Sequence, residues 1–269
     1  MTTMSRSLPP EILDLIVDQL HDEPTTLKVC CLVSKSWIPR IRRHLFAHVD
    51  FSPPKNTFES WMRIFPDPSN SPAHHTRYLS ILDLPTSIPT GMDVGSWIHT
   101  FRNVVQFDFE RCPGIDFISL APFFGFSLAV RSLYMTSTSF EVFDIVCSFP
   151  LLEDLGLIDL FPKGDTFGRN APLTSPKLTG SLDLRARGEI RSVVRRLLNF
   201  PDGLRFADIW VTCLSEDFGS VTDLVSGCSS TLESLNIDRS DESAFLSAHI
   251  ICQHLTAPRR RSHTWGAFP

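Results

Sequence analysis

Residues 8 to 51 decide how the chain begins to fold, and they read LPPEILDLIVDQLHDEPTTLKVCCLVSKSWIPRIRRHLFAHVDF. At about 100° per residue, the apolar side chains between residues 12 and 20 cover roughly 200° of a helix, about twice the stripe that a surface helix needs. They are Ile12, Leu13, Leu15, Ile16, Val17 and Leu20, and only Glu11, Asp14 and Asp18 remain for a narrow wet face. A unit of about 45 residues cannot bury so wide an arc in its own core. We therefore expect part of this arc to contact another protein.

Turn and capping residues divide the same stretch into three helices. Ser7 is placed to cap the first helix, and Pro24 is placed to open a short second one. Ser34 or Ser36 can cap a third helix, with Pro39 in its first turn, where its missing N–H costs little. One face of that helix then carries three apolar side chains four residues apart: Trp37, Ile41 and Leu45.

A family resemblance is carried by Leu8-Pro9-Pro10-Glu11-Ile12-Leu13, then Leu27, then Leu32-Val33-Ser34-Lys35-Ser36-Trp37. This pattern resembles an F-box, most closely those of the large fungal sets, and it covers about 45 of the 269 residues. In that family the box docks on a small Skp-type adaptor, which joins it to a cullin–RING ubiquitin ligase. The resemblance implies that seven residues lie at or just behind the adaptor interface: Leu8, Pro9, Ile12, Leu13, Ile16, Val33 and Trp37. The alternative is a plain three-helix bundle that caps the next domain.

Composition limits the cellular compartments and the classes of partner that we expect for this chain. The net charge of −5 gives the chain no overall field for nucleic acid. We expect no signal peptide, because the first apolar stretch carries Asp14 and Asp18, and no membrane span, because the longest apolar run, from 120 to 130, is too short. The seven cysteines are irregularly spaced and resemble small buried hydrophobes in a reducing compartment. The expected location is the cytoplasm, the nucleus or both.

A linker with one short helix follows the box. Residues 52 to 56 and 66 to 76 are rich in Pro, Ser and Asn, which predicts a break and a loop. Between them, apolar side chains recur at helical spacing, and Asn56 and Glu59 are spaced as a capping pair. We expect this helix to cover one end of the following domain, and the alternative is a partner-binding peptide. Its apolar residues are Phe58, Trp61, Met62 and Phe65.

From residue 77 an apolar motif recurs, in which two residues and then one residue separate three apolar positions. Its copies are Leu79-Leu82-Leu84, Val104-Phe107-Phe109, Val130-Leu133-Met135 and Leu152-Leu155-Leu157, followed less cleanly by Leu182-Leu184, Leu204-Ala207-Ile209 and Leu232-Leu235-Ile237. The steps between the middle residues are 25, 26, 22, 27, 25 and 28, within the period of leucine-rich repeats. The segments between the copies predict helices at Val94–Phe101, Phe140–Phe149, Glu189–Phe200, Asp217–Cys228 and Glu242–Leu255.

Short strands at this period gain stability by stacking on their neighbours. The chain therefore predicts an α/β fold in which a three-helix F-box precedes an irregular leucine-rich-repeat solenoid with a parallel sheet. The resemblance to leucine-rich repeats is degenerate, because the Asn or Cys that should follow the motif is present only as Cys112. A generic βαβ sheet is the alternative fold. The expected domains are 1–52 for the box, 53–76 for the linker, 77–255 for the repeats, and 256–269 for a disordered tail.

No motif for catalysis accompanies this architecture. The sequence lacks a phosphate-binding loop, a dinucleotide fingerprint, a nucleophile elbow and an HExxH metal motif. We therefore expect a non-catalytic substrate-receptor subunit of a Skp–cullin–F-box ubiquitin ligase, whose repeats recruit an unknown protein substrate, without a cofactor, a metal, a nucleic acid or a membrane. The alternative is a leucine-rich-repeat binding scaffold without a ubiquitin role, and an enzyme is a more distant third.

The substrate surface is predicted from the side chains that point away from the core. In an apolar-x-apolar strand the middle residue does so, and these residues are Asp83, Asp108, Tyr134, Gly156, Asp183, Asp208 and Asn236. Parallel strands lie about 4.8 Å apart, so Asp83 is expected to crowd Asp108, and Asp183 to crowd Asp208. We call the aspartates among these middle residues the acidic column. Either an internal arginine, at position 185, 205 or 239, pairs with the carboxylates of the column, or the column binds a basic segment of the substrate. In the second case Tyr134 and Trp210 flank the acidic column.

Overall fold

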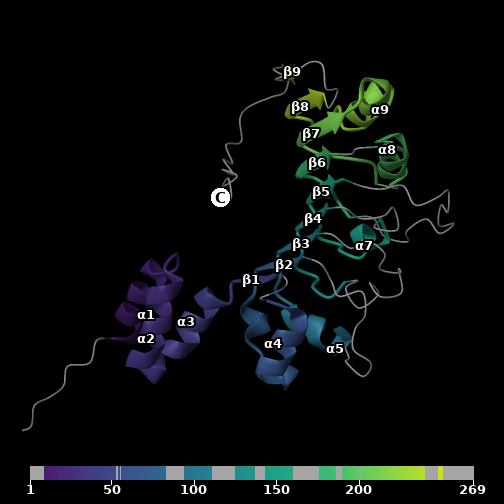
Figure 1. The fold of residues 1–269 in the computed structure, drawn as a ribbon. Helices are drawn as coiled ribbons and strands as arrows, with labels where there is room; N and C mark the ends of the chain where they lie inside the picture. Colours follow the sequence, from purple (N-terminus) through teal and green to yellow (C-terminus); the bar gives the residue numbers. More distant parts are fainter. Residues whose placement is uncertain are drawn as a thin grey trace, which may run out of the picture.

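The structure is a computed structural model, and it describes residues 9–52, 54, 56–82, 94–110, 125–136, 143–159, 176–185, 190–200, 202–239 and 248–250. A small helical bundle precedes one long sheet, and helices lie along one face of that sheet (Figure 1). The chain thus has a mixed α/β fold with a parallel sheet, as the sequence predicts at this level.

Three α-helices form the N-terminal bundle: α1 (Pro10–Gln19), α2 (Pro24–Val33) and α3 (Ile38–Leu45), with a 3-10 turn η1 (Lys35–Trp37) before the last. Ser34 caps η1 by accepting a hydrogen bond from the Ser36 N–H, and Pro39 lies in the first turn of α3, as predicted. Pro9 occupies the N-cap of α1 without a side-chain cap, so the predicted cap, Ser7, is wrong, and Ser7 itself lies outside the described residues.

The bundle has a small core of its own. Val17, Leu27 and Ile41, one from each helix, are buried at its centre. Five half-buried side chains pack around them: Leu20, Cys30, Cys31, Trp37 and Leu45. The predicted inner face of the third helix is confirmed by Trp37, Ile41 and Leu45, which all contact this core.

An ion pair fastens α1 to α3. Asp18 accepts a hydrogen bond from Arg40 Nε at 2.7 Å, a second from Arg40 Nη2, and one from His44 Nε2 at 2.8 Å. These hydrogen bonds hold the pKa of the Asp18 carboxyl well below its usual range. Asp18, one of the three residues predicted for the narrow wet face of the first helix, is thus half-buried and contacted by two side chains of α3.

The sheet begins directly after the bundle, and the first strand was not foreseen. Strand β1 (His48–Phe51) lies within the segment assigned to the box, and helix α4 (Phe58–Ile64) packs beside it. The rings of Phe51 and Phe58 are 5.1 Å apart between centroids. Thr57 caps α4 by accepting from the Ser60 N–H at 3.0 Å, so the helix is confirmed but its predicted capping pair is wrong. Two 3-10 turns, η2 (Pro68–Asn70) and η3 (Pro72–His75), lead into the second strand.

The nine strands that the structure describes pair in chain order. They are β1 (His48–Phe51), β2 (Tyr78–Leu82), β3 (Gln106–Glu110), β4 (Ser132–Thr136), β5 (Asp154–Ile158), β6 (Ser181–Arg185), β7 (Asp208–Cys213), β8 (Ser234–Arg239) and β9 (Ala248–Ile250). Strands β1 to β8 are parallel, and β9 is antiparallel to β8. The residue pairs Asp50↔Ser80↔Asp108↔Tyr134↔Gly156↔Asp183↔Trp210↔Asn236 give steps of 30, 28, 26, 22, 27, 27 and 26 residues. Each strand therefore meets its neighbours after one connection.

Helices cover one face of this sheet and leave the other without a described helix (Figure 1). Besides α4, they are α5 (Val94–Ile98) with η4 (His99–Phe101), α7 (Phe143–Cys147), α8 (Ile190–Leu198), and α9 (Phe218–Gly227) with η7 (Ser215–Asp217). These match four of the five predicted helices. Under them the strands bury alternate apolar residues, such as Leu133 and Met135 of β4, in one continuous core.

The register differs from the predicted motif in two strands. Leu79 and Ile81 pair with Phe107 and Phe109, so the buried positions of β2 are not Leu82 and Leu84. Both sets satisfy the same apolar spacing, and the sequence pattern could not separate them. In β7 the buried residues are Ile209, Val211 and Cys213, whereas Ala207 lies before the start of the strand.

The predicted helix at Glu242–Leu255 is wrong where the structure describes it. Residues 248 to 250 form β9, and Ala248 and Ile250 pair with Ile237 and Leu235 of β8. The remainder of that segment and the expected tail, 256–269, lie outside the described residues.

Candidate functional site

The helical bundle exposes an apolar surface. We call Ile12, Leu15, Ile16, Val29, Leu32 and Val33 the apolar face of the bundle, and all six are exposed large hydrophobic side chains. Leu32 and Val33 retain 87% and 66% of their accessible surface, which is far more than folding alone leaves to a side chain that packs in a core. These exposed apolar side chains make the outer sides of α1 and α2 a candidate interaction surface.

Helical geometry explains why these side chains point outward. At 100° per residue, the exposed residues of α2 lie 140° to 240° around the helix from Leu27, the buried residue of that helix. In α1 the inner face belongs to Val17, with half-buried Leu13 close to it, while Ile12 and Leu15 lie on the far side. The outer half of a surface helix is ordinarily polar. Here it carries three exposed apolar side chains in each helix, beside polar residues such as Gln19 and Thr25.

The predicted adaptor-binding residues separate into three groups. Pro9, Ile12, Ile16 and Val33 are exposed, whereas Leu13 and Trp37 are half-buried, and Leu8 lies outside the described residues. Trp37 packs against the bundle core, behind the surface. The prediction omitted Leu15, Val29 and Leu32, although projecting residues 24 to 33 on a helix around Leu27 would have placed Val29 and Leu32 on the apolar face.

The open face of the sheet carries the second candidate surface. Its central column is Asp50, Ser80, Asp108, Tyr134, Gly156, Asp183, Trp210 and Asn236. Ser80 takes the position predicted for Asp83, which lies outside the described residues, and Trp210 takes the position predicted for Asp208. The two predicted pairs of crowded aspartates are therefore wrong.

Neutral donors hold the carboxylate of Asp108. The hydroxyl of Tyr78 donates to Oδ2, and the Gln106 amide donates to Oδ1 at 3.3 Å. Burial raises the pKa of Asp108, although these hydrogen bonds oppose the shift. The Tyr78 ring also lies against His48, with 4.0 Å between ring centroids. At this end of the open face, the side chains of Tyr78, Gln106 and Asp108 are thus hydrogen-bonded to one another.

Tyr134 lies in the middle of the face, against a glycine. A Cβ added to Gly156 would be 2.2 Å from Cδ1 of the Tyr134 ring, so only glycine leaves room for the ring at this position. Burial raises the pKa of the Tyr134 hydroxyl, and the charges of Asp154, Asp108 and Asp183 raise it further. Tyr134 therefore marks the centre of an acidic region.

Arg185 contacts side chains of both β6 and β7 on the open face. Arg185 makes two hydrogen bonds of 2.8 Å with the Asp183 carboxylate, and its guanidinium lies 4.9 Å from the centroid of the Trp210 ring. The Trp210 indole donates to Asp238 Oδ2 at 3.1 Å, and 41% of the Trp210 surface remains exposed. Of the three arginines considered as internal partners, Arg185 thus neutralises Asp183. The structure brings Asp183 and Trp210 together, but by a register that the sequence did not predict.

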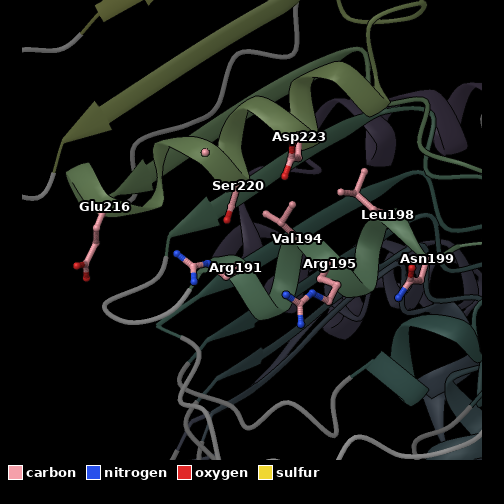
Figure 2. Close-up of a pocket in the computed structure, with 9 residues that line it drawn as sticks. Arg191, Val194, Arg195, Leu198, Asn199, Glu216, Ser220 and Asp223 are labelled. Atoms are coloured by element: carbon pink, nitrogen blue, oxygen red, sulfur yellow. The ribbon is translucent and has the colours of Figure 1, made fainter.

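A third feature is a pocket of about 410 Å³ between α8 and α9, on the helical side of the sheet (Figure 2). Its lining residues are Arg191, Val194, Arg195, Leu198, Asn199, Glu216, Gly219, Ser220 and Asp223. Most of them are exposed, and none next to Ser220 is a histidine or cysteine that would make a nucleophile–base pair. The pocket is a surface groove with mixed charge.

Within the described ranges, no group of three or more His, Cys, Asp or Glu side chains is placed to hold a metal ion. Every described helix is too short or too polar to cross a membrane. Compared with known proteins, the chain matches no family model, no curated protein and no solved structure.

Proposed function

We propose that this chain is a substrate-receptor subunit of a Skp–cullin–F-box ubiquitin ligase. In this proposal the bundle is an F-box that docks on a Skp-type adaptor, and the sheet is a degenerate leucine-rich-repeat domain that recruits a protein substrate. The observation that carries the proposal is the apolar face of the bundle. It lies on the two helices that also hold the first and second parts of the F-box-like sequence pattern.

The energetics favour a protein partner on this face. Among its described residues the bundle buries only three side chains fully in its own core, and these leave the apolar face uncovered. Covering one exposed Leu, Ile or Val contributes about 1.5–3 kcal/mol, so a few of these residues can anchor an interface of ordinary size. A partner that covers the face would therefore also stabilise the bundle.

The contacts that follow α3 explain how the bundle is joined to the sheet, but they do not involve the apolar face of α1 and α2. Phe46, directly after α3, packs edge-on against Trp61 and Phe65 of the linker region, at 5.9 and 6.3 Å between ring centroids. The Ala47 carbonyl accepts hydrogen bonds from the N–H groups of Arg77 and Tyr78. These contacts suffice to join the bundle to the sheet, as the alternative of a binding scaffold with a helical cap requires. They leave the apolar face of α1 and α2 without a role, and adaptor docking supplies one.

The repeat domain fits the role of a receptor. Its strands stack in chain order with steps of 22 to 30 residues, and the open face presents polar, acidic and aromatic side chains to a partner. No group of this face needs to act as a catalyst in the proposal, because the ligase partners supply the chemistry.

The test is binding of the full-length chain to a purified Skp-type adaptor, measured by calorimetry. Changing Ile16 or Leu32 to Asp should weaken binding by at least about 2 kcal/mol, or about thirtyfold in Kd, because each places a charge in the buried interface. Ile64→Asp and Leu128→Asp are matched controls, since these residues are 67% and 66% exposed and lie outside the bundle.

The control variants should bind the adaptor like the unchanged chain, and all four variants should keep the circular dichroism spectrum. Normal adaptor binding by both Ile16→Asp and Leu32→Asp, or no binding by the unchanged chain, would exclude the proposed docking and favour the scaffold alternative.

A further inference from the structure

The pocket between α8 and α9 has a buried floor and charged rims. Its volume of about 410 Å³ is within the range of small-molecule sites. Two of its lining residues, Val194 and Ser220, are only 2% and 8% exposed and form the floor. Leu198 adds an exposed apolar side chain beside them. The floor thus offers both an apolar surface and a hydroxyl group to a molecule in the pocket.

The Ser220 hydroxyl has no hydrogen-bond partner among the described residues. Its side chain points from α9 into the space between the two helices (Figure 2). Thr222 and Ser226 of the same helix behave differently, because each donates to the backbone carbonyl four residues earlier. A buried hydroxyl without a partner loses the hydrogen bonds that it makes in water. A polar ligand in the pocket would restore one of them.

Opposite charges face each other across this pocket. Arg191 and Arg195 are one helical turn apart on α8 and form one rim. Glu216 of η7 and Asp223 of α9 form the other rim. None of these four side chains makes an ion pair with another described residue, so the rims do not close on each other. A molecule that lies between the rims can therefore contact both kinds of charge.

The two rims together select the chemistry of the ligand. An anion alone would be repelled by the carboxylates of Glu216 and Asp223, and a cation alone would be repelled by the two arginines. A molecule with one charge of each sign satisfies both rims. Contact with Val194 and Leu198 favours an apolar group on the same molecule. Free amino acids and dipeptides combine these three properties.

We propose that the pocket between α8 and α9 binds a small zwitterion with an apolar side chain, of the class of free amino acids and dipeptides. The guanidinium groups of Arg191 and Arg195 bind its carboxylate. The carboxylates of Glu216 and Asp223 bind its ammonium group, and the Ser220 hydroxyl hydrogen-bonds to its polar backbone. This binding does not rest on the proposed function, because the pocket is remote from the apolar face of the bundle (Figure 1).

The experiment titrates the full-length chain with the dipeptide alanyl-leucine and follows binding by ligand-observed NMR. Binding should be detectable at low salt and weaker at high salt, because the charges on the rims are exposed. The same dipeptide with an acetylated amine and an amidated carboxylate keeps its apolar side chains but has no charge. It should bind at least about fivefold more weakly to the unchanged chain.

Substitutions in the chain test the same contacts. Arg191→Gln with Arg195→Gln should weaken binding of alanyl-leucine about fivefold, and Ser220→Ala should weaken it about threefold. The matched control is Arg63→Gln with Arg102→Gln, which removes two exposed arginines of α4 and of the residue after η4. These arginines do not line the pocket, so the control should change binding by less than about twofold.

A singly capped ligand tests the orientation. Glu216→Gln with Asp223→Asn should weaken binding of alanyl-leucine, but it should change binding of N-acetyl-alanyl-leucine by less than about twofold, because the ammonium group is already gone. The proposal is overturned if alanyl-leucine does not bind the unchanged chain, or if the doubly capped dipeptide binds equally well. It is also overturned if the control pair weakens binding as much as the α8 pair, or if the carboxylate substitutions weaken both ligands alike.

Discussion

The bundle and the sheet leave opposite kinds of surface uncovered. The bundle surrounds a core of three buried side chains and exposes apolar residues on two helices. The sheet has one continuous core of more than forty buried residues and exposes carboxylates on its open face. An apolar surface binds through desolvation, which tolerates salt, whereas an acidic surface binds through charges that salt screens. The difference therefore predicts two separable interactions on one chain.

The largest expected effect tests whether the two cores are independent. Ile41→Ala and Leu133→Ala each remove a fully buried side chain and should each cost about 2–5 kcal/mol. Because Ile41 belongs to the three-residue core, its loss should unfold the bundle and abolish adaptor binding while the sheet keeps its protection against hydrogen exchange. Leu133→Ala should reduce protection in β3 to β5 and leave the bundle unchanged. Loss of protection in both regions from either variant would contradict this independence.

A smaller effect concerns the packing of Tyr134 on the open face. Gly156→Ala should lower the free energy of unfolding by about 1–3 kcal/mol, since the new methyl group and the Tyr134 ring cannot share the space. Adding Tyr134→Ala should remove most of that penalty, which a double-mutant cycle in urea measures. Gly203→Ala offers no equivalent test because its φ is positive, so Gly219→Ala, where nothing lies within 4 Å, serves as the control. Additive effects of the 134 and 156 substitutions would exclude the contact.

The smallest effects have opposite dependence on pH in the two regions. The pKa of Asp18 is lowered, so its contribution to stability is present above the unfolded pKa of about 3.9 and is lost as the pH falls through the folded value. The pKa of Asp208 is raised, so its contribution is present at acidic pH and is lost as the pH rises through the folded value. At neutral pH, Asp18→Asn should therefore destabilise the bundle, by less than about 1 kcal/mol for so exposed a pair.

Asp208→Asn should instead stabilise the sheet by a few tenths of a kcal/mol at neutral pH, because it relieves like-charge repulsion. Thermal melts at neutral and acidic pH measure both differences, and each difference should shrink on acidification. If Asp208→Asn destabilises the sheet at neutral pH, Asp208 has a stabilising partner and the comparison fails.

Most elements could be predicted from the sequence because periodicity reports burial directly. Leu133 and Met135, like Leu155 and Leu157, alternate within well-separated segments, and their strands lie where the pattern predicts. The predicted strand register is wrong where two alternating apolar patterns overlap, as in residues 79 to 84. A shift by three residues keeps the same apolar spacing there, so the sequence cannot distinguish the two registers. Strand β1 was missed because Val49 and Phe51 are too few to distinguish a strand from the end of a helix.

The candidate surfaces were only partly predictable, for a different reason. Exposure of Ile12 and Ile16 follows from the width of the apolar arc, but Leu32 was read only as part of a family pattern. The contact of Arg185 with Asp183 was foreseen as one of several options, because three arginines stood at plausible distances in sequence. The place of Trp210 between Asp183 and Asn236 depends on register, and register depends on the three-dimensional pairing of strands.

The pairing of strands in chain order has a consequence for synthesis of the protein. Every parallel strand after the first completes its hydrogen bonds with a strand made about 22 to 30 residues earlier. A growing chain can therefore add one strand at a time as it leaves the ribosome, without waiting for a distant segment. A pause in translation would leave the latest strand with one free edge while the earlier strands are already paired.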